Sequence, residues 1–416
     1  MLTKGIFELA LHIENQWHIK DIQFDSENKR LDIHIDFHKG SVFRYESHDE
    51  NIEGDYKAYD TTEKQWRHLN FFEYECFLHA RVPRVKINET TIRQIVPPWS
   101  GQSNGFTMLF EALVLQLASH MPVHTVSKIV NVSNYRIWSM LERYVTMALN
   151  NNDYSELTAV GMDETSKRKG HDYITLFVDL HQKRTVFIAE GKGHETVAEF
   201  VDDVKTHKGQ LEKIKDVSCD MSPAFIKGVK ESLPNAEITF DRFHIMKIIN
   251  NAVDEVRRQE SKEHYGLLKG NRYIFLKNAS NLTSNQRRIR EELSMPKLNL
   301  KSIKALHIRE NFQEIYKAET DTHFESLLKK WYYWATHSRI EPIKDAAYTI
   351  KRHWDGVIQW QKSRINNGLL EGLNSLIQAA KAKARGYRNI RNFKIIAFLV
   401  TGKLDFVTIN KHYLPT

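Results

Sequence analysis

Two short apolar runs in this chain each end at an aspartate, and this pattern constrains the fold more than any other feature. The runs end at Asp163 and Asp220, and both have the composition of buried strands. The surrounding pattern predicts further strands over 173–179, 185–189 and 238–240, with a helix on each side of the Asp220 run. The resulting order β-β-β-α-β-α-β predicts an α/β fold with a ribonuclease-H-like core. In that order the first and fourth strands can lie side by side, so we expect Asp163 and Asp220 to meet.

A third acid, Glu371, lies in the first turns of a predicted helix over residues 368–384. Glu371, Asn374 and Gln378 are spaced i, i+3 and i+7, so they share one face of that helix. A polar stripe of this kind is ordinarily a solvated face. Two strand-end aspartates and a glutamate on a late helix, however, form the layout expected for two-metal phosphodiester chemistry, because divalent cations bind carboxylate oxygens. The pattern therefore predicts Asp163, Asp220 and Glu371 as catalytic metal ligands.

Two neighbouring features have less certain roles. Glu164 follows Asp163 directly, but adjacent strand residues point to opposite faces, so Asp163 is the predicted ligand. Asp241 and His244 lie where the last predicted strand passes into a helix. They can support the metal site or contact DNA, or Asp241 can simply cap the helix.

The stretch between Asp220 and Glu371 is far longer than the core requires, and residues 261–361 read as an α-helical insertion. Its Trp331-Tyr332-Tyr333-Trp334 run can stack on unpaired bases or pack in a core. After the Glu371 helix comes a basic segment, which predicts contact with DNA phosphates, although a charge run is usually solvated surface. Its candidate DNA-binding residues are Lys381, Lys383, Arg385, Arg388 and Arg391.

The N-terminal part divides at Pro97-Pro98. Residues 1–98 are strand-rich, as the alternation of apolar and polar residues over 31–37 indicates. Residues 104–149 predict three helices, with Ser133 capping the third after a tight turn. This is the plan of a helix-turn-helix, although a plain helical bundle gives the same pattern. The candidate DNA-binding residues on the third helix are Asn134, Tyr135, Arg136 and Ser139.

Charge and cysteine content add broad limits. The 416-residue chain has a formal net charge of +8, a modest surplus that favours a polyanionic partner. Its two cysteines, Cys76 and Cys219, cannot build a disulfide framework or a four-cysteine zinc site. The start of the sequence carries no cleavable apolar signal and no run is long enough to cross a membrane, so we expect a cytoplasmic protein.

Several motifs together resemble the transposases of the bacterial ISL-three insertion-sequence family, whose catalytic residues are two aspartates and a glutamate (DDE). The motifs are GMDET at 161–165, DMSPAF at 220–225, DRFH at 241–244, NGLLEGLN at 367–374 and RGYRN at 385–389. The resemblance implies that the three acids bind Mg²⁺ or Mn²⁺ and that 104–149 is a helix-turn-helix. One departure is clear: the family usually has an N-terminal zinc ribbon, whereas Ile87 and Thr90 stand where a Cys-x-x-Cys pair is expected. Zinc is therefore not expected, and the domain either keeps its shape through an apolar core or is decayed.

The resulting expectation is a four-part enzyme that acts on double-stranded DNA. Its parts are a β-rich domain (1–98), a helix-turn-helix (104–149), a ribonuclease-H-like core (155–260 with 362–416) and the helical insertion. The resemblance implies a DDE transposase that binds terminal inverted repeats, cleaves the element ends and joins the 3′-OH to target DNA. We expect it to act as a homo-oligomer on DNA, associated with the nucleoid and not with membranes. The alternatives are a nuclease on the same core that does not join ends, and a DNA-binding regulator with an idle catalytic centre.

Overall fold

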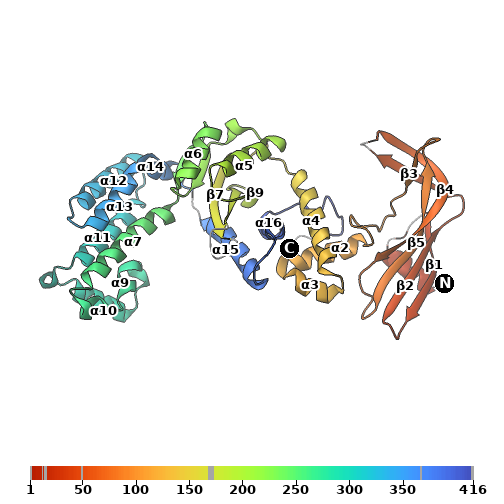
Figure 1. Cartoon of the computed structure of the whole chain (residues 1–416), viewed down its shortest axis with the longest axis horizontal. Helices are drawn as coiled ribbons and strands as arrows, with labels where there is room; N and C mark the ends of the chain where they lie inside the picture. The colour runs from red at the N-terminus through yellow and green to blue at the C-terminus, as the bar shows by residue number, and fades with distance from the viewer. Residues whose placement is uncertain are drawn as a thin grey trace. The chain divides into compact units, whose positions relative to one another are not determined.

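The computed structural model describes residues 2–11, 13, 16–47, 50–166, 173–365 and 368–413 (Figure 1). Its contacts divide the chain into two compact units. The first unit contains residues 1–152 and 377–416, and the second contains residues 153–376. Within the described residues, no helix combines the length and apolarity needed to cross a membrane.

The N-terminal part of the first unit is a β-sheet preceded by one short helix. Helix α1 (Leu2–Ala10) is followed by β1 (Trp17–Asp25), β2 (Arg30–Phe37), β3 (Val42–Ser47), β4 (Ile52–Arg67), β5 (Glu75–Lys86) and β6 (Ile92–Gln94). The strand order is β1-β2-β5-β4-β3, with β6 paired to β5. The alternation read from residues 31–37 is confirmed, because Leu31, Ile33 and Ile35 are buried.

An apolar core, rather than thiolates, holds this sheet together. Three tryptophans, Trp17, Trp66 and Trp99, are buried in it, and the rings of Trp17 and Trp99 meet edge to face at 5.0 Å. Ile87, at one of the positions where the family has cysteine, packs against this core. Cys76 is buried as a free thiol. Of the two possibilities left open by the missing cysteines, the structure thus shows an apolar core.

The three predicted helices are present: α2 (Met108–His120), α3 (Val123–Val130) and α4 (Asn134–Asn150). Asn131 ends α3 in the left-handed conformation with φ 51°, which turns the chain sharply. The Ser133 side chain then accepts a hydrogen bond from Arg136 N, as the predicted cap requires. These local signals were sufficient to place the turn correctly.

The C-terminal residues pack on this helix-turn-helix. Helix α16 (Ile390–Thr401) contacts α4, and the Asn410 side chain donates to Met108 O (2.8 Å) and to the Tyr144 hydroxyl (2.9 Å). The expected boundaries differ here, since they assigned all of 362–416 to the core. The division between the two units instead falls within α15 (Gly368–Lys383), after Leu376, and α16 contacts both α4 and α2.

The second unit is built on a five-stranded sheet. Its strands are β7 (Ala159–Ser166), β8 (Tyr173–Asp179), β9 (Arg184–Glu190), β10 (Asp216–Cys219) and β11 (Glu237–Phe240), in the order β11-β10-β7-β8-β9. Strand β10 runs parallel to β7 and β11, whereas β8 is antiparallel to β7 and β9. Helix α5 (Glu195–Thr206) follows β9 and α6 (Pro223–Ser232) follows β10. The predicted element order and the pairing of the first and fourth strands are confirmed.

The expected insertion is helical. It continues from α7 (Arg242–Glu260) through α8 (Tyr265–Leu268), α9 (Arg272–Leu276), α10 (Ser284–Leu293), α11 (Lys301–Ile315), α12 (Asp321–Thr336), α13 (Glu341–Arg352) and α14 (Trp354–Ser363). Trp331 packs in its core and donates to Ile308 O at 2.9 Å, so this aromatic side chain is structural. Tyr333 and Trp334 are exposed. Helix α14 packs closely on β11, where a Cβ at Gly356 would lie 2.4 Å from the Phe240 ring.

Candidate active site and DNA-binding surface

The strand register places three carboxylates in one row. Ser218 pairs with Gly161 and Cys219 pairs with Phe240. Because all three strands run parallel, continuing this register sets Asp220 level with Asp163 on one side and with Asp241 on the other. The carboxyl ends of parallel strands are where α/β sheets place their ligands. The two predicted aspartates are therefore brought together, and Asp241 joins them.

The Asp163 carboxyl lies in an environment that resists negative charge. Burial raises its pKa above the ordinary value, and the charges of Asp220 and Asp241 raise it further. The Glu164 backbone N–H, which donates to Asp163 Oδ1 at 2.8 Å, and the His244 side chain act in the opposite direction. A site that concentrates carboxylates in this way favours a cation.

Asp241 combines the two roles that the sequence left open. Its Oδ1 accepts a hydrogen bond from Phe243 N at 2.9 Å and caps α7. Its Oδ2 lies 3.1 Å from His244 Nδ1. The contact with Asp241 raises the pKa of His244, and the charges of Asp163 and Asp220 raise it further. His244 therefore faces the row of acids as a potential cation and proton donor.

Helix α15 is docked against β7 next to this row. The Asn374 side chain donates a hydrogen bond to Asp163 Oδ2 at 2.5 Å. Leu370 and Leu373 pack with Val178 on the same side of the sheet. At Gly161 a Cβ would lie 2.9 Å from Leu370 Cδ1, so the glycine permits this close approach. The polar face predicted for α15 is thus turned, at Asn374, toward the first aspartate.

Glu371 lies one turn before Asn374 on α15 and is exposed. Within the described ranges, no three carboxylate, imidazole or thiolate groups converge closely enough to hold one metal ion, so the structure does not gather Glu371 with the two aspartates. Gln378 lies farther along the helix and is half-buried. Asn366 and Asn367, which begin this motif, lie outside the described residues.

Glu164 has a different environment from Asp163. Burial raises the pKa of Glu164, the charge of Asp220 raises it further, and Lys192 opposes the shift. No hydrogen bond to α15 involves it among those found for the described residues, whereas Asp163 binds Asn374. Because the charge of Asp220 affects both side chains, the choice of Asp163 over Glu164 as the metal ligand stays a prediction.

The candidate recognition residues lie on the exposed first turns of α4. Asn134, Tyr135, Arg136 and Ser139 are all exposed, with Tyr135 81% accessible. The Arg136 guanidinium lies 4.0 Å from the Phe106 ring centroid and donates to Asn104 O at 3.0 Å. The sequence analysis did not identify Asn104 and Phe106 as contacts of Arg136. The polar, glycine-containing segment 101–105 indicated a loop at this point but not its contact with α4.

Comparison with known proteins agrees with this arrangement. The family model for ISL3 DDE transposases, described as "Transposase", matches residues 160–397, and the helix-turn-helix domain of transposase family ISL3 matches residues 85–145. The chain belongs to the ISL3 transposase family. It is 24% identical to the transposase for insertion sequence element IS1001 of Bordetella parapertussis, over 81% of this chain and 84% of that protein. It is also 24% identical to the transposase for IS1557 of Mycobacterium tuberculosis, over 81% of each chain.

In this family member, the basic segment that follows α15 lies against the helix-turn-helix. Lys383 Nζ donates to His120 O at 3.4 Å, and Arg391 forms an ion pair with Glu142. The Tyr387 ring meets Trp138 edge to face at 6.2 Å, and burial raises the pKa of Tyr387 to about 12. Arg385 and Arg388 are exposed. The segment was predicted to serve the catalytic site; its contacts show that it belongs to the DNA-binding unit, and phosphate contact stays a prediction.

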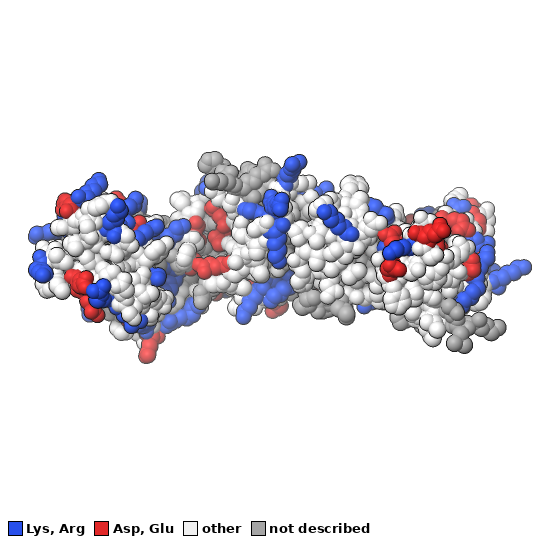
Figure 2. Space-filling view, turned by 90° about the horizontal axis from the view of Figure 1, so that it is seen from below, with Lys and Arg blue, Asp and Glu red and all other residues white. Residues whose placement is uncertain are grey.

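Basic side chains alone do not mark the DNA-binding face. Figure 2 shows both acidic and basic side chains over the helical insertion at the left and the β-rich domain at the right. The side chains that line individual pockets are therefore a better guide to a polyanion-binding site than the distribution of charge over the whole surface.

The donors around Asp163 fit a hard divalent cation. Asp163 and Asp220 offer carboxylate oxygens, the ligands that Mg²⁺ and Mn²⁺ prefer. The Asn374 Oδ1 atom is buried and has no hydrogen-bond partner among the described residues. A buried amide oxygen without a partner next to a carboxylate destabilises the fold unless a cation or a water molecule binds to it.

Proposed function

We propose that this chain is an active transposase that binds the terminal inverted repeats of its element, hydrolyses the phosphodiester at each end and joins the freed 3′-OH to target DNA. The ISL3 family membership supports the reaction class. The observation that carries the proposal is the register that sets Asp163 level with Asp220, together with the Asn374 hydrogen bond that docks α15 beside them. It acts on double-stranded DNA as a homo-oligomer, in the bacterial cytoplasm.

The catalytic core is proposed to be ribonuclease-H-like. Three antiparallel strands followed by two parallel ones, with the first and fourth adjacent, is the topology observed. The helical insertion separates the last strand from α15. This connectivity brings a late helix next to Asp163 on the first strand, which is where the third acid is needed.

Asp163, Asp220 and Glu371 are proposed to hold Mg²⁺ or Mn²⁺. When bound, the cation activates the attacking oxygen and stabilises the leaving one. Glu371 is assigned because it lies three residues before Asn374, about 60° away around the helix, and so faces the same side as the residue that binds Asp163. Its exposure leaves it free to turn toward incoming DNA and metal.

Asp241 and His244 are proposed to orient the site and move protons. Asp241 fixes the start of α7 and holds His244 next to the row of acids. The contact with Asp241 raises the pKa of His244 and so favours its protonated form, which can donate to a phosphate oxygen of the scissile strand.

The test uses the purified chain and duplexes that carry the DNA flanking its own gene. We expect end cleavage with Mg²⁺ or Mn²⁺, and joining when the end is supplied pre-cut. Asp163→Asn, Asp220→Asn and Glu371→Gln should each abolish cleavage while leaving DNA binding nearly intact. Glu164→Gln serves as the matched control and should be much milder.

Each alternative gives a distinct result in that assay. A nuclease on the same core would cleave but would not join a pre-cut end. A regulator with an idle centre would bind the duplex and do neither. Substantial cleavage by the Glu371→Gln variant would remove this residue from the site.

A further inference from the structure

The loop over residues 100–105, between the β-rich domain and α2, is held from beneath by a buried carboxylate. Glu111 accepts hydrogen bonds from Gln102 N (2.7 Å) and Ser103 N (2.6 Å), and from the Tyr144 hydroxyl (2.6 Å). At Gly101 a Cβ would lie 2.2 Å from Glu111 Oε2, so only glycine leaves room for this arrangement. The loop is therefore fixed on the helix-turn-helix, and its outer side chains are presented in a defined geometry.

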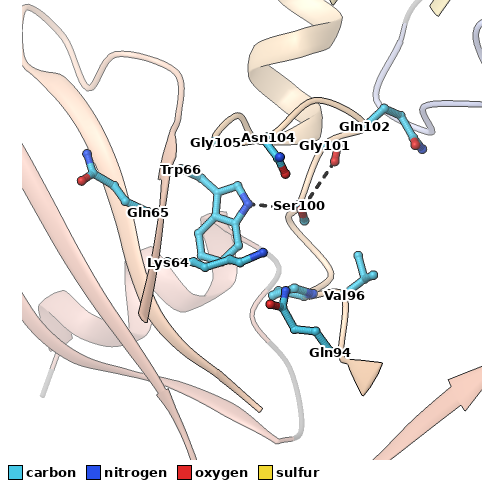
Figure 3. Close-up of a pocket in the computed structure, with 11 residues that line it drawn as sticks. Lys64, Gln65, Trp66, Gln94, Val96, Ser100, Gly101, Gln102, Asn104 and Gly105 are labelled. Carbon is cyan, nitrogen blue, oxygen red and sulfur yellow. Dashed lines mark hydrogen bonds between the residues drawn. The ribbon is translucent and has the colours of Figure 1, made fainter. Parts of the chain in front are cut away.

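The outer side of this loop forms one wall of a pocket of about 440 Å³. Figure 3 shows Lys64, from β4, and Gln94, from β6, around the same pocket, with the Trp66 indole donating to Ser100. None of the eleven described residues that line it is acidic. Lys64 is the basic side chain among them, and most of the remaining polar groups are carboxamides. Such a lining donates hydrogen bonds and repels no anion.

A second pocket, of about 250 Å³, shares Asn104 with the first. Its lining includes Arg136 and Arg143 on α4 and again contains no acidic residue among those described. Gly105 adopts φ +76°, and a Cβ there would lie 3.1 Å from Arg136 Nη2. Because Gly105 has no Cβ, the Arg136 guanidinium has room to contact both Asn104 and Phe106.

We infer that the two pockets form one DNA-contacting strip, in which the pocket at Lys64 holds a backbone phosphate of the duplex whose base edges face α4. Phosphate oxygens accept hydrogen bonds from lysine and carboxamide side chains, and such contacts fix the register of a recognition helix on DNA. The β-rich domain then acts with the helix-turn-helix on one duplex, although it has no zinc ligands. This inference rests on the proposed DNA binding but not on catalysis.

The first experiment measures the salt dependence of binding to a mixed-sequence duplex of about 40 bp, roughly four helical turns. The full-length chain carries Asp220→Asn so that the duplex stays intact. One lost phosphate contact lowers the magnitude of the slope of log K against log salt by about 0.9. Over a four-fold rise in salt, the loss of affinity of the Lys64→Ala variant should therefore be about 3.5-fold smaller than that of its parent. Lys57→Ala, on the same strand but outside both linings, should keep the parent slope.

The second experiment locates the DNA without relying on affinity. Both native cysteines are buried, and Val96, at the first pocket, is 74% exposed, so Val96→Cys provides one accessible thiol for an iron chelate. We expect the tethered chelate to cut the bound duplex. The same chelate on Tyr59→Cys, an exposed β4 position that lines neither pocket, should not.

The outcomes separate this inference from the proposed function. Equal salt slopes for the Lys64→Ala and Lys57→Ala variants, or equal scission from positions 96 and 59, would overturn the strip while leaving DNA binding by α4 in place. Failure of the parent chain to bind any duplex would instead overturn the proposed function. Normal binding and footprints without cleavage by the unsubstituted chain would contradict the catalytic proposal alone.

Discussion

The packing of Leu370 against Gly161 offers the sharpest test of how α15 is held at the acids. A Cβ at Gly161 would lie 2.8 Å from Leu180 Cδ2 and 2.9 and 3.0 Å from the two δ carbons of Leu370. Carbon atoms pack best at about 3.5–4.0 Å, so Leu370 must retreat by roughly 0.5–1 Å. Overpacking of this kind costs about 1–3 kcal/mol, and moving a catalytic group by about 1 Å can cost about 100-fold in rate. Gly161→Ala should therefore slow cleavage by about 10- to 100-fold.

The assay is a double-mutant cycle with Leu370→Ala, which removes the obstructing side chain on α15 and leaves Leu180 in place. Leu370→Ala alone should cost about 2–5 kcal/mol through the cavity it leaves. If the two sites interact as described, the double variant should be more stable than the sum of the two effects by about 1–3 kcal/mol. Denaturant unfolding followed by circular dichroism and the rate of end cleavage are the two readouts. Gly266→Ala, where nothing lies within 4 Å of the new Cβ, is the control. Strict additivity in both readouts would refute the coupling between β7 and α15.

Three further predictions concern the first unit. Arg136→Ala should weaken binding to the element's ends by about 1–3 kcal/mol and reduce discrimination against unrelated DNA; equal loss on specific and random duplexes would reject base readout. Burial raises the pKa of the Glu111 carboxyl above 4.5, so the folded chain binds the proton of this carboxyl more tightly than the unfolded chain does. The free energy of unfolding that protonated Glu111 contributes should therefore fall as pH rises from about 4.5 through the raised pKa. Glu111→Gln should flatten that part of the stability–pH curve, and an unchanged slope would contradict it. Dialysis against a chelator should leave the circular dichroism spectrum intact because the β-rich domain has an apolar core; one tightly bound zinc per chain in elemental analysis would contradict this.

Local signals in the sequence determined the secondary structure around both functional regions. Ser133 and the turn before it predicted the start of α4, because capping and turn preferences act over three or four residues. The apolar runs before Asp163 and Asp220 predicted two strands correctly. Asp220 follows the end of β10, whereas β7 continues to Ser166, so the prediction that this strand ends at Asp163 was wrong. The adjacency of those strands followed from the element order, which leaves few ways to pair them.

The positions of side chains across elements required the tertiary structure. Asp241 read equally well as a helix cap, and only the register of β10 and β11 sets it level with the other aspartates. The basic segment follows α15 in sequence, yet its ion pair and ring contacts are with α4. A run of charged residues has no periodicity from which its partner could be predicted. The contact between the Tyr387 and Trp138 rings identifies that partner as α4.

The contrast between Asn374 and Arg136 shows the physical reason. Both were singled out from helical spacing, which fixes the face of a helix but not what that face meets. Asn374 contacts Asp163 and Arg136 contacts Asn104 and Phe106 only because long-range packing brings separate elements together. Helical periodicity is a property of neighbouring residues, so the sequence by itself determined which side chains share a face, while the tertiary contacts decided their partners.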